Sequence, residues 1–91
     1  MQRLYSIVAL RLIFRELYDE LYDRFREELR AVVPRFLDEW VGNVIYLVFS
    51  EASYDYVVEF VKKVKDKYGI IDARGADVFV YGFMKPGSRI I

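Results

Sequence analysis

Aromatic and basic side chains gather near the end of the 91-residue sequence. Three aromatic residues recur there at every second position: Phe79, Tyr81 and Phe83. A strand from Val78 to about Met84 would place the three rings on one face, with Lys85 and Arg89 directly after it. Rings on an open sheet face beside positive charge are what single-stranded nucleic acid needs for stacking and phosphate contacts. The same combination also describes half of a protein–protein interface, so both kinds of partner remain open.

The first strand is expected to complete this face. Between Arg3 and Phe14 the apolar residues alternate, which favours a central strand over a helix. If this strand pairs with the last one, Tyr5 lies beside the three rings, and the basic residues surround them. The predicted binding site, for nucleic acid or a protein partner, therefore contains Arg3, Tyr5, Arg11, Phe79, Tyr81, Phe83, Lys85 and Arg89.

Catalytic chemistry has few candidates in this sequence. The chain contains no His and no Cys, so we expect no catalysis by histidine, no disulfide, no zinc or other metal site and no cofactor. Asp72 and Asp77 with Lys85 resemble a carboxylate–carboxylate–lysine nuclease arrangement, but their spacing fits no nuclease pattern well. The sequence therefore predicts a protein that binds and is not an enzyme, with a metal-dependent nuclease as a remote alternative.

The composition indicates a partner. Apolar residues make up 55% of the chain and aromatic residues 18%, which is more apolar surface than a single domain of this size readily buries. A second copy of the chain would cover it, so a homo-oligomer is expected, and a homodimer without nucleic-acid binding is the alternative function. The formal net charge is zero, which argues against a generic duplex binder.

The charges are unevenly distributed along the chain. Residues 1–15 hold three arginines and no acid, residues 16–59 hold eleven acids against four arginines, and residues 60–91 hold seven basic residues against three acids. Many charges, no Thr and only one Asn and one Gln suggest a thermophilic source. No apolar run is long enough to span a membrane and no signal peptide is recognised, so a cytoplasmic protein without membrane association is expected.

Two amphipathic helices are expected between the strands. From Leu17 to Val32 the apolar residues recur at helical spacing, and from Tyr54 to Tyr68 they do so again. Ser50 is a predicted N-cap for the second helix, and Gly69 is a predicted C-terminal stop. Val44–Phe49 reads as a strand before the second helix, and a loop is expected between Gly69 and Val78.

Residues 31–43 leave two folds open. Pro34 disfavours a continuous helix, which favours an edge strand over Ala31–Leu37 with a turn over Asp38–Asn43. Phe36 and Trp40 stay in helical phase, which favours a first helix running to about Glu39. The first reading gives one α+β domain over residues 1–91 with the ferredoxin-like βαββαβ sandwich. The second gives a three-stranded β-α-β-α-β sandwich with a long first helix. In both, two helices cover one face of the sheet and the other face stays open.

Several short motifs resemble one known family. Arg3-Leu4-Tyr5 is a basic-aromatic first strand, Val44–Val48 runs into a helix over Tyr54–Val61, and Gly82 precedes the turn Pro86-Gly87-Ser88. Together they resemble the small protein subunit of archaeal and eukaryal ribonuclease P, which has a fold like that of the RNA-recognition motif. The resemblance covers most of the chain, although Pro86 and Ser88 stand where the family has serine and threonine. It implies a non-catalytic ribonucleoprotein subunit that binds a partner subunit and assists an RNA enzyme.

Overall fold

A computed structural model of the chain describes residues 7–76, 78–80, 83–85 and 89–91. Helices and strands follow one another along the chain as β1 (Ile7–Phe14), α1 (Asp19–Val32), β2 (Leu37–Val41), β3 (Val44–Ser50), a 3₁₀ turn η1 (Glu51–Ser53), α2 (Tyr54–Tyr68), β4 (Ile70–Ala76), β5 (Val78–Val80) and β6 (Phe83–Lys85). Neither helix of this described part is long and apolar enough to cross a membrane.

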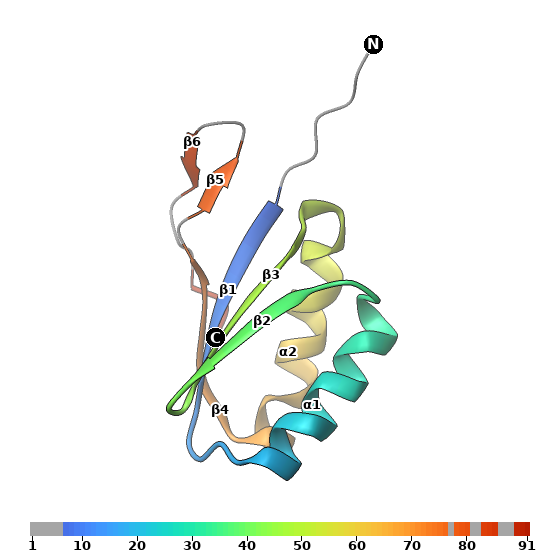
Figure 1. Cartoon of the computed structure of the whole chain (residues 1–91), viewed down its shortest axis with the longest axis vertical. Coiled ribbons are helices and arrows are strands. Elements are labelled where there is room, and N and C mark those ends of the chain that lie inside the picture. Colours follow the sequence, from blue (N-terminus) through green and yellow to red (C-terminus); the bar gives the residue numbers. More distant parts are fainter. Residues whose placement is uncertain (1–6, 77, 81–82, 86–88) are drawn as a thin grey trace.

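The sheet is antiparallel and lies under both helices. Its strands follow the order β2-β3-β1-β4, so β1 is central and pairs with β3 on one side and β4 on the other. Figure 1 shows α1 and α2 side by side on one face of this sheet, and no helix of the described residues covers the opposite face. An α+β fold with two helices over a four-stranded antiparallel sheet is therefore confirmed, and it is consistent with the ferredoxin-like plan.

The core fills the space between the sheet and the helices. It is built from one face of each central strand and one stripe of each helix: Val8, Leu10, Leu12 and Phe14 of β1, Ile45, Leu47 and Phe49 of β3, Leu21, Phe25 and Leu29 of α1, and Val57, Phe60, Val61, Val64 and Tyr68 of α2. The period of two in the strands and of 3.6 in the helices turns these residues inward. Both predicted helical stripes are thus confirmed, and the opposite faces of the strands are left to solvent.

The segment after α1 differs from both sequence-based readings. α1 ends at Val32, so a helix continuing to Glu39 is wrong, and the edge strand β2 spans Leu37–Val41, so a strand over Ala31–Leu37 is wrong as well. Pro34 disfavours the helical region for the residue before it, and Val33 accordingly has φ −133° and ψ 109°. The proline therefore ends the helix, and the strand begins only after it.

The end of the chain also departs from the prediction. Ile70–Ala76, expected as a loop, is the strand β4 beside β1, whereas Val78–Met84 is not one strand. Instead β5 and β6 pair antiparallel with each other, Val80 opposite Phe83, beyond the end of β4 (Figure 1). Because β4 already occupies the outer edge of β1, the aromatic segment does not become the fourth strand of the sheet.

Gly69 ends α2 as predicted. Its backbone has φ 69° and ψ 36°, in the left-handed region, and its N–H donates to the Lys65 carbonyl. A Cβ at this position would meet only the Arg15 Cβ at 3.7 Å, an ordinary contact, so conformation and not space demands glycine. At the other end, the Ser50 hydroxyl accepts a hydrogen bond from Ala52 N and caps η1, which leads into α2.

Replacing Gly69 by alanine is expected to lower the free energy of unfolding by about 1 kcal/mol, because a Cβ strains the left-handed conformation. Asparagine tolerates this region better, so Gly69→Asn serves as the matched control and should cost clearly less. Urea unfolding followed by circular dichroism measures both. Equal losses for the two variants would show that the backbone conformation is not the cause.

Candidate functional site

The open face of the sheet carries a row of arginines at its centre. In the strand registers, Tyr46 of β3 lies opposite Arg11 of β1, and Arg11 lies opposite Arg74 of β4. Beyond β4, Arg89 forms a bridge opposite Arg74. Paired residues in an antiparallel sheet point to the same face, so Tyr46, Arg11, Arg74 and Arg89 form one line across it. We call these four residues the arginine row.

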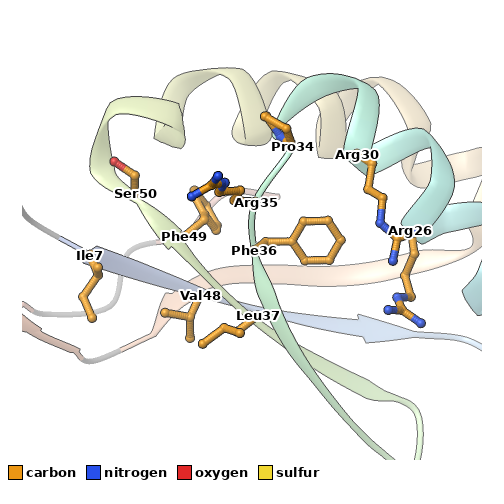
Figure 2. Close-up of a pocket in the computed structure, with 10 residues that line it drawn as sticks. All are labelled: Ile7, Arg26, Arg30, Pro34, Arg35, Phe36, Leu37, Val48, Phe49 and Ser50. Carbon is orange, nitrogen blue, oxygen red and sulfur yellow. The ribbon is translucent and has the colours of Figure 1, made fainter.

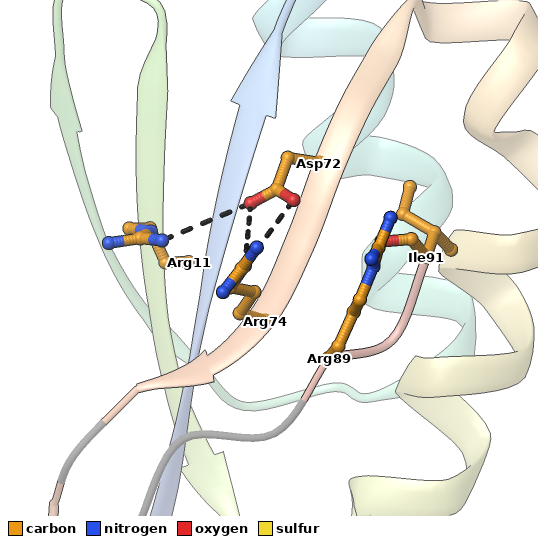
Figure 3. A network of polar contacts seen from close by, with 5 residues as sticks. All are labelled: Arg11, Asp72, Arg74, Arg89 and Ile91. Atoms are coloured by element: carbon orange, nitrogen blue, oxygen red, sulfur yellow. Dashed lines mark hydrogen bonds and ion pairs between the residues drawn. The ribbon is translucent and has the colours of Figure 1, made fainter.

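One carboxylate serves two members of the row. Asp72, two residues before Arg74 on the same strand, lies 3.4 Å from the Arg74 Nε and 3.9 Å from the Arg11 Nη2. Figure 3 shows the contacts of the Asp72 carboxylate with both guanidinium groups. Arg89 Nε donates to the main-chain oxygen of Ile91 at 3.1 Å. Glu39 of β2 lies opposite Tyr46 at the other end of this line, so three arginines face two carboxylates, and positive charge is in excess by one.

These ion pairs are too weak to explain the row by stability alone. The side chains of Arg11 and Arg74 are 40% and 49% exposed, and exposed pairs contribute about 0–1 kcal/mol each. Like charges directly opposite one another on neighbouring strands are destabilising, and here this occurs twice, at Arg11–Arg74 and Arg74–Arg89. The Arg11 Nε is also buried without a hydrogen-bond acceptor among the described residues. The row thus has unused donors and unbalanced charge, which suits an anion.

Two aliphatic rows border the arginine row. Val41, Val44 and Ile13 lie opposite one another on one side, and Leu37, Val48 and Ala9 do so on the other. Their outermost members are open to solvent, since Leu37 is 73% and Val41 55% exposed. The open face therefore combines a charged centre with apolar flanks, the reverse of the apolar core and polar rim of a typical protein–protein interface.

The structure brings together only part of the predicted site. Arg11 and Arg89 lie in the arginine row. Phe79 belongs to β5, and Phe83 and Lys85 belong to β6, so these three do not lie on a fourth strand paired with β1. Arg3, Tyr5, Tyr81, Gly82 and the turn Pro86–Ser88 lie outside the described residues.

Two members of the row were missed in the sequence. Arg74 was assigned to a loop because Asp, Ala and Gly around it are poor strand formers. Tyr46 alternates with the buried residues Ile45 and Leu47, and this period of two was the available signal that it faces away from the core. Recognising β4 would have placed Arg74 next to Arg11, whereas Tyr46 needed the pairing of β3 with β1.

One of the two carboxylates in the nuclease alternative, Asp72, pairs with arginines of the row. Asp72 contacts two guanidinium groups, and Asp77 lies outside the described residues. Within the described part of the chain, no group of three Asp or Glu side chains is arranged to hold a metal ion.

A second polar cluster fastens the edge strand β2 to α1. The Tyr22 hydroxyl donates a hydrogen bond to the Asp38 carboxylate, which also pairs with the Arg26 Nε at 3.2 Å. The Tyr22 ring packs on Trp40, with 4.7 Å between centroids. Burial, followed by the hydrogen bond to Asp38, raises the pKa of Tyr22 from 10.0 to about 12. The cluster thus anchors the edge strand β2 to α1, on the helix-covered side of the sheet.

The Tyr22 cluster predicts a stability loss at high pH. The folded state holds the Tyr22 proton more tightly than the unfolded state, so the stabilisation is complete below pH 10 and is lost as the pH rises towards 12. We expect Tyr22→Phe to lose less stability than the wild type between about pH 10 and pH 12 in urea unfolding. Tyr56→Phe, at a 68% exposed position, is the control. A wild-type decline that Tyr22→Phe reproduces in full would contradict the prediction.

Comparison of the chain with protein-family models, with curated proteins and with solved structures finds no match in any of the three. The open sheet face is therefore the basis on which a function is proposed.

Proposed function

We propose that the protein is a non-catalytic binding module whose open sheet face binds single-stranded RNA, as an RNA-binding or ribonucleoprotein subunit. The observation that carries this proposal is the arginine row, in which Arg11 and Arg74 on adjacent strands share one carboxylate, Asp72, and Arg89 lies opposite Arg74. Such a row costs stability in the free protein. Like charges that face one another on neighbouring strands, with no evident structural gain, are typical of a functional surface.

The chemistry of the row suits a nucleic-acid strand. Guanidinium groups donate paired hydrogen bonds to phosphate oxygens, and the exposed edges of Arg11 and Arg74 leave such donors available. Tyr46, 40% exposed beside Arg11, offers a ring on which a base can stack. We expect the arginine row to bind unpaired strands, because the bases of a duplex do not expose their faces for stacking on the Tyr46 ring.

The fold supports the same proposal. The β2-β3-β1-β4 order with two helices on one face supports assigning the chain to the ferredoxin-like βαββαβ fold. RNA-recognition motifs use the open face of a four-stranded sheet for single-stranded RNA. The resemblance of the sequence to the small protein subunit of ribonuclease P implies a partner of this kind too.

Fluorescence anisotropy with a labelled oligouridylate tests the proposal. Binding should weaken with salt, with a slope of log K against log salt of about −2 for three arginine–phosphate contacts on a single strand. Duplex RNA of the same length should bind more weakly. Absence of binding at low salt, or binding that does not respond to salt, would refute the RNA proposal.

A homodimer formed through the same face is the second candidate function. The observation favouring it is that Leu37, Val41 and Ile7 expose 73%, 55% and 49% of their surface on this face. Apolar side chains gathered on one face mark contact surfaces. In this form the aliphatic rows of two copies would cover each other, and the arginine row between them would lie within the contact.

Light scattering after size exclusion distinguishes the two candidates. A dimer that Leu37→Arg converts to a monomer would favour the homodimer, and Tyr56→Arg on α2 is the control at a similarly exposed position, 68% against 73%. A protein that stays monomeric at high micromolar concentration excludes this candidate and leaves RNA binding as the role of the face.

A further inference from the structure

A pocket separate from the arginine row opens where α1 ends and β2 begins. Its volume is about 590 Å³, within the range of about 300–1,000 Å³ that small-molecule sites occupy. It is lined by residues from α1, from the segment after it, and from the ends of three strands: Arg26, Arg30, Pro34, Arg35, Phe36, Leu37, Val48, Phe49, Ser50 and Ile7. Figure 2 shows these side chains around the segment that connects α1 to β2.

The body of the pocket is apolar. Phe36 and Phe49 contribute rings, and Val48, Leu37 and Ile7 contribute aliphatic surface. Phe49 belongs to the buried core, with 4% exposure, so this wall is fixed by the fold. An apolar ligand would gain affinity by leaving water here.

Within the described part of the chain, the charged side chains that line the pocket are all arginines. Arg26 is already engaged by Asp38 at 3.2 Å. Arg30 lies over the Phe36 ring, 5.9 Å from its centroid, and this contact holds the guanidinium group against the apolar wall. Among the described residues, no carboxylate pairs with Arg30 or Arg35, and none lines the pocket. Two cations therefore lack a counter-charge beside an apolar cavity.

The helix dipole explains the position of only one of these two arginines. Arg30 lies in the last turn of α1, where a cation is favourable in any helix. Arg35 lies five residues after Arg30, beyond the end of α1 at Val32, so the helix dipole does not explain its position. The first six residues of the chain bring no complementary charge either, since they contain Arg3 and no acid.

We propose that this pocket binds an amphipathic monocarboxylate of the medium-chain fatty-acid class. The hydrocarbon chain lies against Phe36, Phe49 and Val48, and the carboxylate accepts hydrogen bonds from Arg30 and Arg35. The charge excess selects an anion, and the apolar wall selects a ligand with a hydrocarbon body. A nucleic-acid strand suits this pocket poorly, because its ribose and phosphate groups would face the apolar wall.

Titration of the full chain with octanoate, followed in ¹H–¹⁵N spectra, tests the assignment. Saturable shifts are expected in residues 26–37 and 48–50. Octan-1-ol, which has the same chain without the charge, should bind about tenfold or more weakly, since charge-assisted hydrogen bonds are absent. Failure of octanoate to give saturable shifts, or equal binding of the two ligands to the unchanged protein, would overturn the proposal.

Variants locate the site and separate it from the arginine row. Arg30→Gln with Arg35→Gln should weaken octanoate by about tenfold or more and leave octan-1-ol unchanged. Arg11→Gln with Arg74→Gln, which removes equal charge from the open face, should leave octanoate binding unaltered. An equal loss in both double variants would mean that net charge and not the pocket binds the acid.

A competition experiment separates this inference from the proposed function. Octanoate should not displace a labelled oligouridylate from the arginine row, because Arg30 and Arg35 hold the acid, although Leu37 and Val48 belong both to the pocket and to the aliphatic row beside the arginine row. If octanoate displaces the oligouridylate from the wild type but not from the Arg30→Gln, Arg35→Gln variant, the pocket is part of the RNA-binding surface. That result would overturn a separate fatty-acid site. If the chain binds no RNA at all, the octanoate result stands by itself.

Discussion

Replacing Phe25 by alanine is expected to lower the free energy of unfolding by about 3–5 kcal/mol. Phe25 is fully buried, and its ring meets three others, those of Phe14, Phe60 and Tyr68, at centroid distances of 5.5, 5.8 and 5.5 Å. It therefore joins β1, α1 and α2. The total free energy of unfolding of a small domain is about 5–15 kcal/mol, so this single change removes a large part of the stability.

Urea unfolding of the Phe25→Ala variant measures this loss. Tyr56→Ala is the control, because Tyr56 is an aromatic residue of α2 that is 68% exposed. A surface substitution of this kind changes stability by about 0.5 kcal/mol or less. A cost below about 1 kcal/mol for Phe25→Ala would contradict the described packing of the helices on the sheet.

Removing two charges from the arginine row is expected to weaken RNA binding by about 100-fold. In the Arg11→Gln, Arg74→Gln variant each lost guanidinium–phosphate contact contributes about 1.5 kcal/mol, which is about tenfold. The slope of log K against log salt should fall in magnitude by about 1.4, because two phosphate contacts on a single strand disappear. Fluorescence anisotropy at several salt concentrations measures both quantities.

The matched control removes two charges from the opposite side of the molecule. Lys62 and Lys63 are exposed on α2, and Lys62→Gln with Lys63→Gln changes the net charge by the same amount. This control should leave RNA affinity within about threefold of the wild type, since exposed charges beyond a Debye length of about 10 Å are screened. An equal loss in both variants would show that the arginine row makes no specific contact.

The stability of the same variant provides an independent check. Like charges face each other at Arg11–Arg74 and Arg74–Arg89, and the two pairs with Asp72 are exposed. Neutralising Arg11 and Arg74 should therefore leave the unfolding midpoint unchanged or raise it. A row retained for structure would instead lose stability on this change.

Local patterns predicted the helices well. The α2 stripe and the stop at Gly69 follow from helical spacing and from a residue that tolerates positive φ, and both are decided within a few neighbouring residues. The same holds for the open sheet face, because two amphipathic helices of this length cover only one side of a small sheet. These features needed no knowledge of which strands pair.

Strand pairing was the part that local patterns did not decide. Ile70–Ala76 has low strand propensity, and it becomes β4 because its backbone hydrogen-bonds to β1. The aromatic segment has high propensity, yet it forms the separate β5–β6 pair. Because the site residues come from three strands and from the segment of Arg89, an error in one strand removed Arg74 from the predicted site.

Chemical-shift mapping with a short oligouridylate is the most direct test of the claim that the open sheet face binds RNA. The largest ¹H–¹⁵N shifts are predicted at Arg11, Tyr46 and Arg74 and their neighbours on β1, β3 and β4, with the exposed face of α1 and α2 unaffected. Shifts confined to the helices, or none at a concentration where a salt-sensitive single-stranded RNA binder saturates, would contradict it.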